Sequence, residues 1–146
     1  MPSNRSLWFD RLGPLKGLII RQPWANMVVM GEKKWEIRGF RVHFRGPVAI
    51  IAAGTGTVVG SCELVDCLGP LNLEMYNRNF QLMGSSNTAV ETLPYQNTYA
   101  WVMAQPRAFQ HPIPYSHPKG AVIWVKLPDE TRQLTRDAER ANGRLG

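Results

Sequence analysis

The sequence is poor in the side chains that most often bind metals or form disulfides. It has two cysteines and three histidines among 146 residues. The histidines are scattered, and a zinc site needs more ligands at tighter spacing. We therefore expect no metal and no cofactor, and we expect Cys62 and Cys67 to be reduced, buried thiols. Their positions differ in parity, so in a regular strand they would face opposite sides of the sheet and could not easily form a disulfide.

Long apolar runs are also missing. No run approaches the roughly 20 residues that a membrane-spanning helix requires, and the first residues lack the apolar centre of a signal peptide. We therefore expect no membrane span, with a cytoplasmic location as the default. The hydrophobic content of 44% and the five tryptophans are sufficient for the core of one domain.

Positive charge is abundant, and it is concentrated in one part of the chain. Residues 1–46 hold nine Lys/Arg against three Asp/Glu, whereas residues 47–128 and residues 129–146 each hold four of either sign. The whole net charge of +6 therefore comes from the first third of the sequence. Clustered cations attract a nucleotide or a polyanion. The alternative is a basic surface that serves solubility alone, and charge by itself does not decide between the two.

The hydrophobic pattern predicts more strands than helices. A helix should begin at Pro23 and end near Gly31, a second helix is a candidate over residues 71–83, and the proline-rich residues 105–120 suit an extended edge segment. Gly60 marks a bulge or a close backbone approach. The predicted strands are residues 17–21, 34–38, 46–54, 57–68, 98–104 and 121–127.

These elements predict an α+β fold. We expect a small, closed or nearly closed β-barrel of about five to six strands with flanking helices. The barrel domain should span residues 17–128, after an N-terminal arm of residues 1–16. Residues 129–146 are polar with mixed charges, and we expect a tail there that forms a short helix or no regular structure. The sequence does not predict the oligomeric state.

The stretch "GEKKWEIRGFR" carries the densest set of opposite charges. In a strand, Trp35 and Ile37 would face one side while Glu36 and Arg38 face the other. If the charged face lines a cleft, Lys33 could contact a phosphate or act as a base, and Glu36 could accept hydrogen bonds from a base amino group. Arg38 could bind a phosphate or a carbonyl, or orient Glu36. The alternative is an exposed strand face whose ion pair contributes less than about 1 kcal/mol.

Aromatic side chains are the second candidate feature. Trp24, Trp35, Trp101 and Trp124 lie in predicted elements, where burial in the core is the ordinary expectation. Trp24 also lies close to the charged stretch, which makes it the best candidate for the wall of a base-stacking pocket. Gln22, two residues before it, could read the edge of a base. Arg21, Arg41 and Arg45 could guide a nucleic-acid backbone.

The segment "IIRQPWANMVVMGEKKWEIRGF" resembles the opening of the ASCH domain, a PUA-like family. The similarity rests on "RQPWA" and on G-x-K-x-x-E-x-R, here Gly31, Lys33, Glu36 and Arg38. It continues through "RGPVAIIAAG", "VVGSCELVDC" and the block that begins "YAWVMAQPRAF", and it covers residues 17–127. The resemblance implies a small β-barrel with helices at its openings and a cleft that is lined by the motif beside the first helix.

The resemblance also implies a choice of functions. Family members are associated with RNA or modified-nucleoside binding, and some with DNA. One bacterial branch is an amidohydrolase that removes the acetyl group from acetylated cytidine with the motif lysine, a threonine and a later glutamate. By position these are Lys33, the place where this chain has Glu36, and Glu74 by a loose alignment. The departure at Glu36 weakens the enzyme interpretation because a carboxylate does not reproduce the chemistry of a hydroxyl.

Three functions follow as hypotheses. The first is binding of RNA, a nucleotide or a modified nucleoside in a cleft lined by Gln22, Trp24, Lys33, Glu36 and Arg38, with DNA as a further candidate partner. The second is hydrolysis of an acylated cytidine or of RNA, with Lys33 and either Glu36 or Glu74 as catalytic residues. The third is an interaction adaptor that presents the proline-rich residues 105–118.

Overall fold

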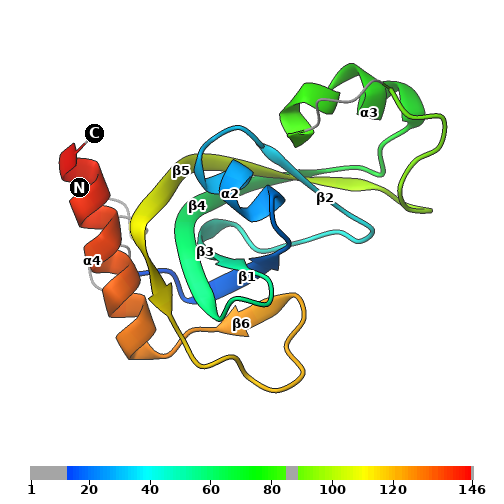
Figure 1. The fold of residues 1–146 in the computed structure, drawn as a ribbon. Helices are drawn as coiled ribbons and strands as arrows, with labels where there is room; N and C mark the ends of the chain where they lie inside the picture. Colours follow the sequence, from blue (N-terminus) through cyan, green and yellow to red (C-terminus); the bar gives the residue numbers. More distant parts are fainter. Residues whose placement is uncertain (1–12, 85–88, 146) are drawn as a thin grey trace, which may run out of the picture.

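The computed structural model describes residues 13–84 and 89–145. Its centre is one six-stranded sheet that curls strongly on itself (Figure 1). The strand order is β2-β5-β4-β3-β1-β6, and β1 runs parallel to β3 while the other described pairs are antiparallel. The strands are β1 (Lys16–Ile20), β2 (Trp35–Arg38), β3 (Gly46–Ala52), β4 (Thr57–Leu68), β5 (Tyr99–Pro114) and β6 (Trp124–Lys126).

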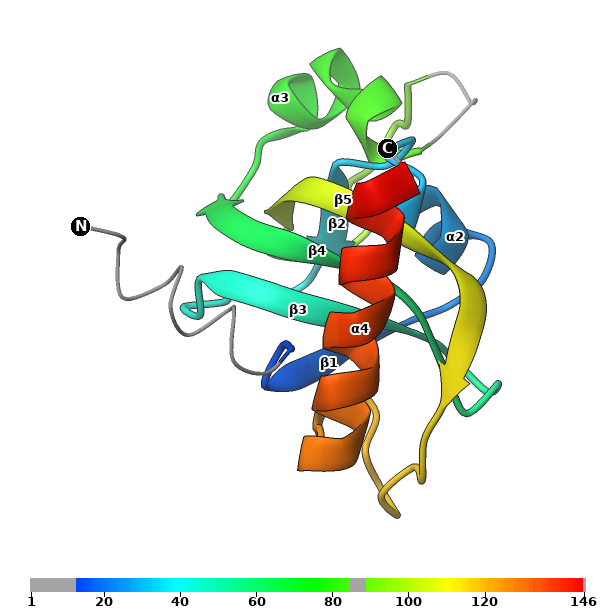
Figure 2. The same cartoon turned by 90° about the vertical axis from the view of Figure 1, so that its left-hand side faces the viewer.

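Within the described residues, three α-helices and one 3-10 helix flank the sheet. They are α2 (Trp24–Val29), α3 (Leu73–Arg78), the 3-10 helix η1 (Phe80–Met83) and α4 (Asp129–Leu145). Figure 2 shows α4 lying across the outer side of the curled strands, while α3 stands at another end of the molecule. The predicted α+β fold, a small and nearly closed barrel with flanking helices, is confirmed. No helix in the described part of the chain is long and apolar enough to cross a bilayer.

The barrel remains open between its edge strand β2 and the β1–β6 side, and we call this gap the seam. Side chains bridge the seam where backbone pairing does not. Arg38 on β2 donates from Nη2 to the carbonyl oxygen of Ile19 on β1, at 3.0 Å. The rings of Trp101 on β5 and Trp124 on β6 stack at 5.9 Å with an interplanar angle of 12°. The seam is therefore fixed in width, and its floor is made of aromatic and charged groups.

Three hydrophobic clusters account for most of the burial. The interior cluster joins the inward faces of the strands to Ala25, Val28 and Val29 of α2, so this helix plugs one opening of the barrel. The second lies outside the sheet, where Ala138 of α4 packs against it. In the third, Trp35 of β2 packs with Met83 of η1. Trp35 and Ile37 thus face one side of β2, as the alternation predicts.

The two cysteines are free and buried, as predicted, but the prediction that they face opposite sides is wrong. Both belong to the interior cluster. The register between β4 and β5 shifts between Leu64 and Asp66, and this irregularity breaks the period-two alternation and turns Cys67 inward. Burial raises the pKa of the Cys62 thiol, so this thiol stays protonated.

Gly60 lies at a point where neighbouring segments of the chain come very close to its backbone, as expected. A Cβ built there would lie 2.2 Å from the carbonyl oxygen of Arg107 and 2.5 Å from Cγ1 of Val29. The glycine therefore lets β4 pass between β5 and helix α2. Gly31, predicted to end the first helix, has φ of +83° directly after the α2 C-cap Met30.

The two ends of the barrel domain differ from the sequence expectation in detail. Residues 129–146 were expected to form a short helix or none, and α4 instead has 17 residues that pack on β4 and β5. Its buried positions include Thr131, Thr135 and Glu139, which a search for apolar spacing does not detect. Of the predicted N-terminal arm, residues 1–12 lie outside the described residues. Gly13 is joined to α4 by a hydrogen bond from its N–H to the carbonyl oxygen of Arg132, at 3.1 Å.

Candidate ligand-binding site

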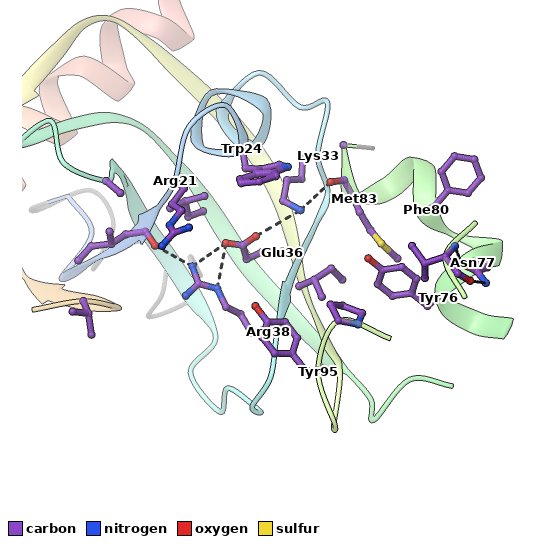
Figure 3. Close-up of a pocket in the computed structure, with 18 residues that line it drawn as sticks. Arg21, Trp24, Lys33, Glu36, Arg38, Tyr76, Asn77, Phe80, Met83 and Tyr95 are labelled. Carbon is purple, nitrogen blue, oxygen red and sulfur yellow. Dashed lines mark hydrogen bonds and ion pairs between the residues drawn. The ribbon is translucent and has the colours of Figure 1, made fainter. Parts of the chain in front are cut away.

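A pocket of about 870 Å³ lies at the seam, along the unpaired edge of β2. Because this edge has no neighbouring strand, the pocket takes side chains from both faces of β2. Figure 3 shows the charged motif residues in its centre, with aromatic rings around them. The 18 lining residues are Ile19, Ile20, Arg21, Trp24, Lys33, Glu36, Ile37, Arg38, Ala53, Tyr76, Asn77, Phe80, Met83, Gly84, Val90, Pro94, Tyr95 and Val122.

Lys33 lies in the turn before β2, and its ammonium group is buried. Its relative exposure is 5%. Nζ donates to the carbonyl oxygen of Trp35 at 2.7 Å and to that of Met83 at 2.9 Å, and it lies 3.6 Å from Oε1 of Glu36. Burial lowers the pKa of Lys33, while the neighbouring Glu36 opposes that shift. Lys33 thus connects the start of β2 to the end of η1.

Glu36 and Arg38 form a close ion pair on the charged face of β2. Arg38 donates to Oε2 of Glu36 from Nη2 at 2.9 Å and from Nε at 3.3 Å. Side-chain exposure is 9% for Glu36 and 17% for Arg38, so solvent screens this pair far less than a surface pair. The guanidinium also lies over the Trp101 ring, 5.5 Å from its centroid. The alternative of an exposed, ion-paired strand face is therefore wrong for these residues.

Trp24 begins helix α2 at the pocket rim. Its relative exposure is 44%, whereas Trp35 and Trp101 are buried at 8% and 0%. An exposed indole beside a buried ion pair is available for stacking. Core burial, the ordinary expectation for all four tryptophans, is therefore wrong for Trp24, and the structure places this residue in the lining of the pocket.

The remaining predicted residues divide into one that lines the pocket and four that do not. Arg21 is exposed at the pocket wall. Gln22 is outside the lining, and its Oε1 accepts a hydrogen bond from the N–H of Asn26 at 3.1 Å, which satisfies a free donor at the start of α2. Glu74 is also outside the lining, and it pairs with Arg78 on exposed α3. The geometry therefore does not bring Glu74 to Lys33.

Arg41 and Arg45 lie beyond the pocket on the connection between β2 and β3. Arg41 donates to the carbonyl oxygen of Gly69 at 3.0 Å and lies over the Tyr99 ring, 5.0 Å from its centroid. Arg45 donates to the carbonyl oxygens of Val42 and Phe44. Both stay near the surface, so they extend the positive charge away from the pocket along one connection.

The sequence analysis missed the far wall of the pocket. Tyr76, Phe80 and Tyr95 line it from α3, η1 and the following loop. The segment was predicted as a helix candidate and a loop, with no functional residue except Glu74. The only local signal is that Tyr76 and Phe80 stand on either side of the polar run of residues 77–79. Their contact with β2 depends on tertiary structure, through a hydrogen bond from the N–H of Lys34 to the carbonyl oxygen of Leu82 at 2.7 Å.

Comparison with known proteins agrees with this architecture. The sequence model of the ASCH domain matches residues 18–113. The crystal structure of ASCH from Zymomonas mobilis superposes with a TM-score of 0.60 at 15% identity, covering 81% of this chain and 90% of that one. Two point mutants of the same protein superpose with TM-scores of 0.60 and 0.58, also at 15% identity, covering 82% of this chain and 94% and 92% of theirs. A search of curated proteins finds no match.

The curled sheet plugged by an early helix is a small α+β fold that the solved ASCH structures share. The match over residues 18–113, well over half of the chain, is more specific. The chain belongs to the ASCH domain family, which is generally associated with RNA binding.

Proposed function

We propose that this protein binds single-stranded RNA and holds one nucleotide in the seam pocket. The observation that carries the proposal is the combination of a half-exposed Trp24 with the buried Glu36–Arg38 pair in one cavity large enough for a nucleotide. A flat ring and a few oriented polar groups are what binding of an unstacked base requires. DNA is the competing partner, and it lacks the 2′-hydroxyl that distinguishes RNA.

The charge distribution supports the same proposal. Arg21 lines the pocket, and Arg41 and Arg45 continue the positive surface along the β2–β3 connection. In this proposal the base enters the pocket while the strand follows these arginines. The proposed pocket residues are Lys33, Glu36, Arg38 and Trp24. Gln22 contributes indirectly, because its hydrogen bond with Asn26 holds the first turn of α2.

Replacing Trp24 tests the proposal, because this side chain is largely outside the core and its loss should leave the fold intact. We expect Trp24→Ala to weaken binding of a short single-stranded RNA by about fivefold or more, from a stacking contribution of roughly 1–3 kcal/mol. Fluorescence anisotropy with a labelled oligonucleotide measures this. Met30→Ala, an exposed apolar residue beyond the same helix, is the matched control. Equal affinities of the two variants would contradict the proposal, and a DNA oligonucleotide of equal sequence tests the choice of RNA.

A second candidate function is hydrolysis, favoured by one specific observation. Nζ of Lys33 lies 3.6 Å from Oε1 of Glu36, and burial lowers the pKa of Lys33. A lysine of lowered pKa beside a carboxylate is suited to proton transfer. The substrates would be an acylated cytidine or an RNA phosphodiester. Mass spectrometry of modified nucleosides and short RNAs after incubation detects product, and an unchanged rate with Lys33→Ala would exclude this mechanism.

A further inference from the structure

We infer that the pocket orients a nucleotide with its base toward Glu36 and its phosphate toward Arg21, and that it selects cytosine and adenine. The inference rests on the proposed function and adds the orientation and the class of base. On their Watson–Crick edges, these two bases share an exocyclic amino group beside an unprotonated ring nitrogen, whereas the ring nitrogen on that edge of guanine is protonated. The argument depends on which donors and acceptors of the motif are already engaged within the protein.

Lys33 is buried, and it uses two of its donors within the protein. An ammonium group carries three N–H donors. Two of them reach the carbonyl oxygens of Trp35 and Met83, and Nζ also forms an ion pair with Oε1 of Glu36 at 3.6 Å. Lys33 is therefore a positioning residue: it holds β2, η1 and the Glu36 side chain in one arrangement.

The Glu36–Arg38 pair keeps one acceptor and one donor for a ligand. Oε2 of Glu36 accepts both hydrogen bonds from Arg38. Among the residues that the structure describes, none donates a hydrogen bond within 3.5 Å to Oε1 of Glu36, and none accepts one from Nη1 of Arg38. Both groups line the pocket. The floor of the pocket therefore presents a carboxylate oxygen and a guanidinium N–H that belong to the same ion pair.

This donor–acceptor pair matches the edge of cytosine or adenine. The amino group donates to Oε1 of Glu36 while the neighbouring ring nitrogen accepts from Nη1 of Arg38. Uracil and hypoxanthine place a carbonyl oxygen where the amino group was and a protonated ring nitrogen beside it. In the same position, their oxygen would meet the carboxylate and their N–H would meet the guanidinium. Both contacts are repulsive, so these bases are disfavoured.

The charges along the pocket place the phosphate outside. The Glu36 carboxylate at the floor repels a phosphate, and the Lys33 ammonium group is buried, with two of its donors bound to backbone carbonyl oxygens. Arg21 lines the pocket wall and is exposed, and in residues 13–84 and 89–145 its guanidinium has no hydrogen-bond or ion-pair partner. It is thus a cation with all donors available. In Figure 3, Arg21 lies at one end of the row of charged side chains, beside the Glu36–Arg38 pair.

The positions of the aromatic side chains also fit a base whose polar edge faces the Glu36–Arg38 pair. In the view of Figure 3, Trp24 lies on one side of the Glu36–Arg38 pair and Tyr95 on the other. Trp24 and Tyr95 are 44% and 45% exposed, and both line the cavity. A flat base between them would keep its polar edge toward Glu36 and its sugar toward the rim.

Base selection is tested with matched pairs of nucleotides. Calorimetry should give cytidine and adenosine 5′-monophosphate at least about tenfold higher affinity than uridine and inosine 5′-monophosphate, in line with one bidentate contact. Glu36→Gln, whose amide both donates and accepts, should reduce this ratio to near one. Glu130→Gln, at an exposed position of α4, removes the same charge away from the pocket. This variant should keep the wild-type ratio of affinities. Equal affinity of the wild-type protein for all four nucleotides would overturn the inference.

Orientation is tested by comparing each nucleotide with its nucleoside. In the wild type the 5′-phosphate should strengthen binding several-fold, and Arg21→Ala should remove this gain while the preference for cytidine over uridine remains. Lys119→Ala, which removes one exposed charge elsewhere, should leave both effects in place. If the 5′-phosphate strengthens binding by the same factor in Arg21→Ala, the proposed orientation is overturned. Absence of binding to these nucleotides and to single-stranded RNA overturns the proposed function itself, whereas RNA binding without base preference overturns the inference alone.

Discussion

At Lys33, two physical effects act in opposite directions on one ammonium group. Burial disfavours its charged form, and the nearby Glu36 favours that form. Two backbone carbonyl oxygens accept hydrogen bonds from the same nitrogen. The side chain is therefore a structural connection between the motif strand and the aromatic wall of the pocket, whatever chemistry the pocket performs.

Replacing Lys33 should therefore cost stability as well as function. Lys33→Met keeps much of the side-chain volume but leaves the carbonyl oxygens of Trp35 and Met83 without this donor. We expect the free energy of unfolding to fall by about 1–3 kcal/mol, the usual cost of unsatisfied buried polar groups. Urea denaturation measures it. The exposed neighbour provides the control, and an equal effect of Lys34→Met would show that the buried connection contributes nothing.

At the scale of elements, the two faces of β2 could be predicted from the sequence. The aromatic wall on the far side of the pocket could not. Alternation in "KWEIR" placed Trp35 and Ile37 on one face and Glu36 and Arg38 on the other, as the structure has them. Tyr76 and Tyr95 reach the same pocket only because α3 and the following loop fold back on β2. No periodic pattern encodes that contact. The cysteine prediction failed for a related reason, since a register shift in β4 cannot be read from alternation.

Helix α4 shows a second limit of sequence patterns. Its buried face carries Thr131, Thr135 and Glu139 in place of aliphatic residues. Oε2 of Glu139 accepts a hydrogen bond from the hydroxyl of Ser61 at 2.6 Å, whereas Oε1 has no partner within the described residues. Burial raises the pKa of Glu139, and the Ser61 hydroxyl, Arg107 and Arg136 only partly oppose that rise. We therefore expect the charge state of Glu139 to affect the docking of α4 on the sheet.

This burial predicts a pH dependence of stability. In the folded state Glu139 keeps its proton above its ordinary pKa of 4.5, so between 4.5 and the raised value the native protein binds more protons than the unfolded one. Its contribution to stability is then full below pH 4.5 and declines as pH rises through that window. Glu139→Gln should gain stability relative to the wild type over the same window. Urea unfolding at a series of pH values measures it.

The control for this prediction lies on the same helix. Glu130 is exposed in the first turn of α4, so Glu130→Gln should follow the pH curve of the wild type. If Glu139→Gln also ran parallel to the wild type, burial of this carboxyl group would not govern the docking of α4.

At the scale of the whole molecule, the open seam and the uneven charge belong together. The net charge of +6 comes from residues 1–46, and within the described part Arg21, Arg41 and Arg45 lie along the pocket side and the β2–β3 connection. The fold could be predicted because its blocks occur in order along the sequence. The seam could not, because it depends on which strands remain at the edges of the sheet.

Binding of single-stranded RNA should weaken steeply with salt. If Arg21, Arg41 and Arg45 each contact one phosphate, the logarithm of the binding constant should fall against the logarithm of salt concentration with a slope of about −2. Arg21→Ala should make the slope shallower by roughly 0.7. Anisotropy titrations at several salt concentrations give both values. A flat response would mean that phosphate contacts do not contribute.

The central claim is that the hollow at the seam is the place where a base is held. A crystal structure of the protein with a short single-stranded RNA containing cytidine and adenosine tests it most directly. We expect one base between Trp24 and Tyr95, with its amino group at Oε1 of Glu36 and its phosphate near Arg21. RNA bound on another face, with the seam pocket empty of any base, would contradict the account.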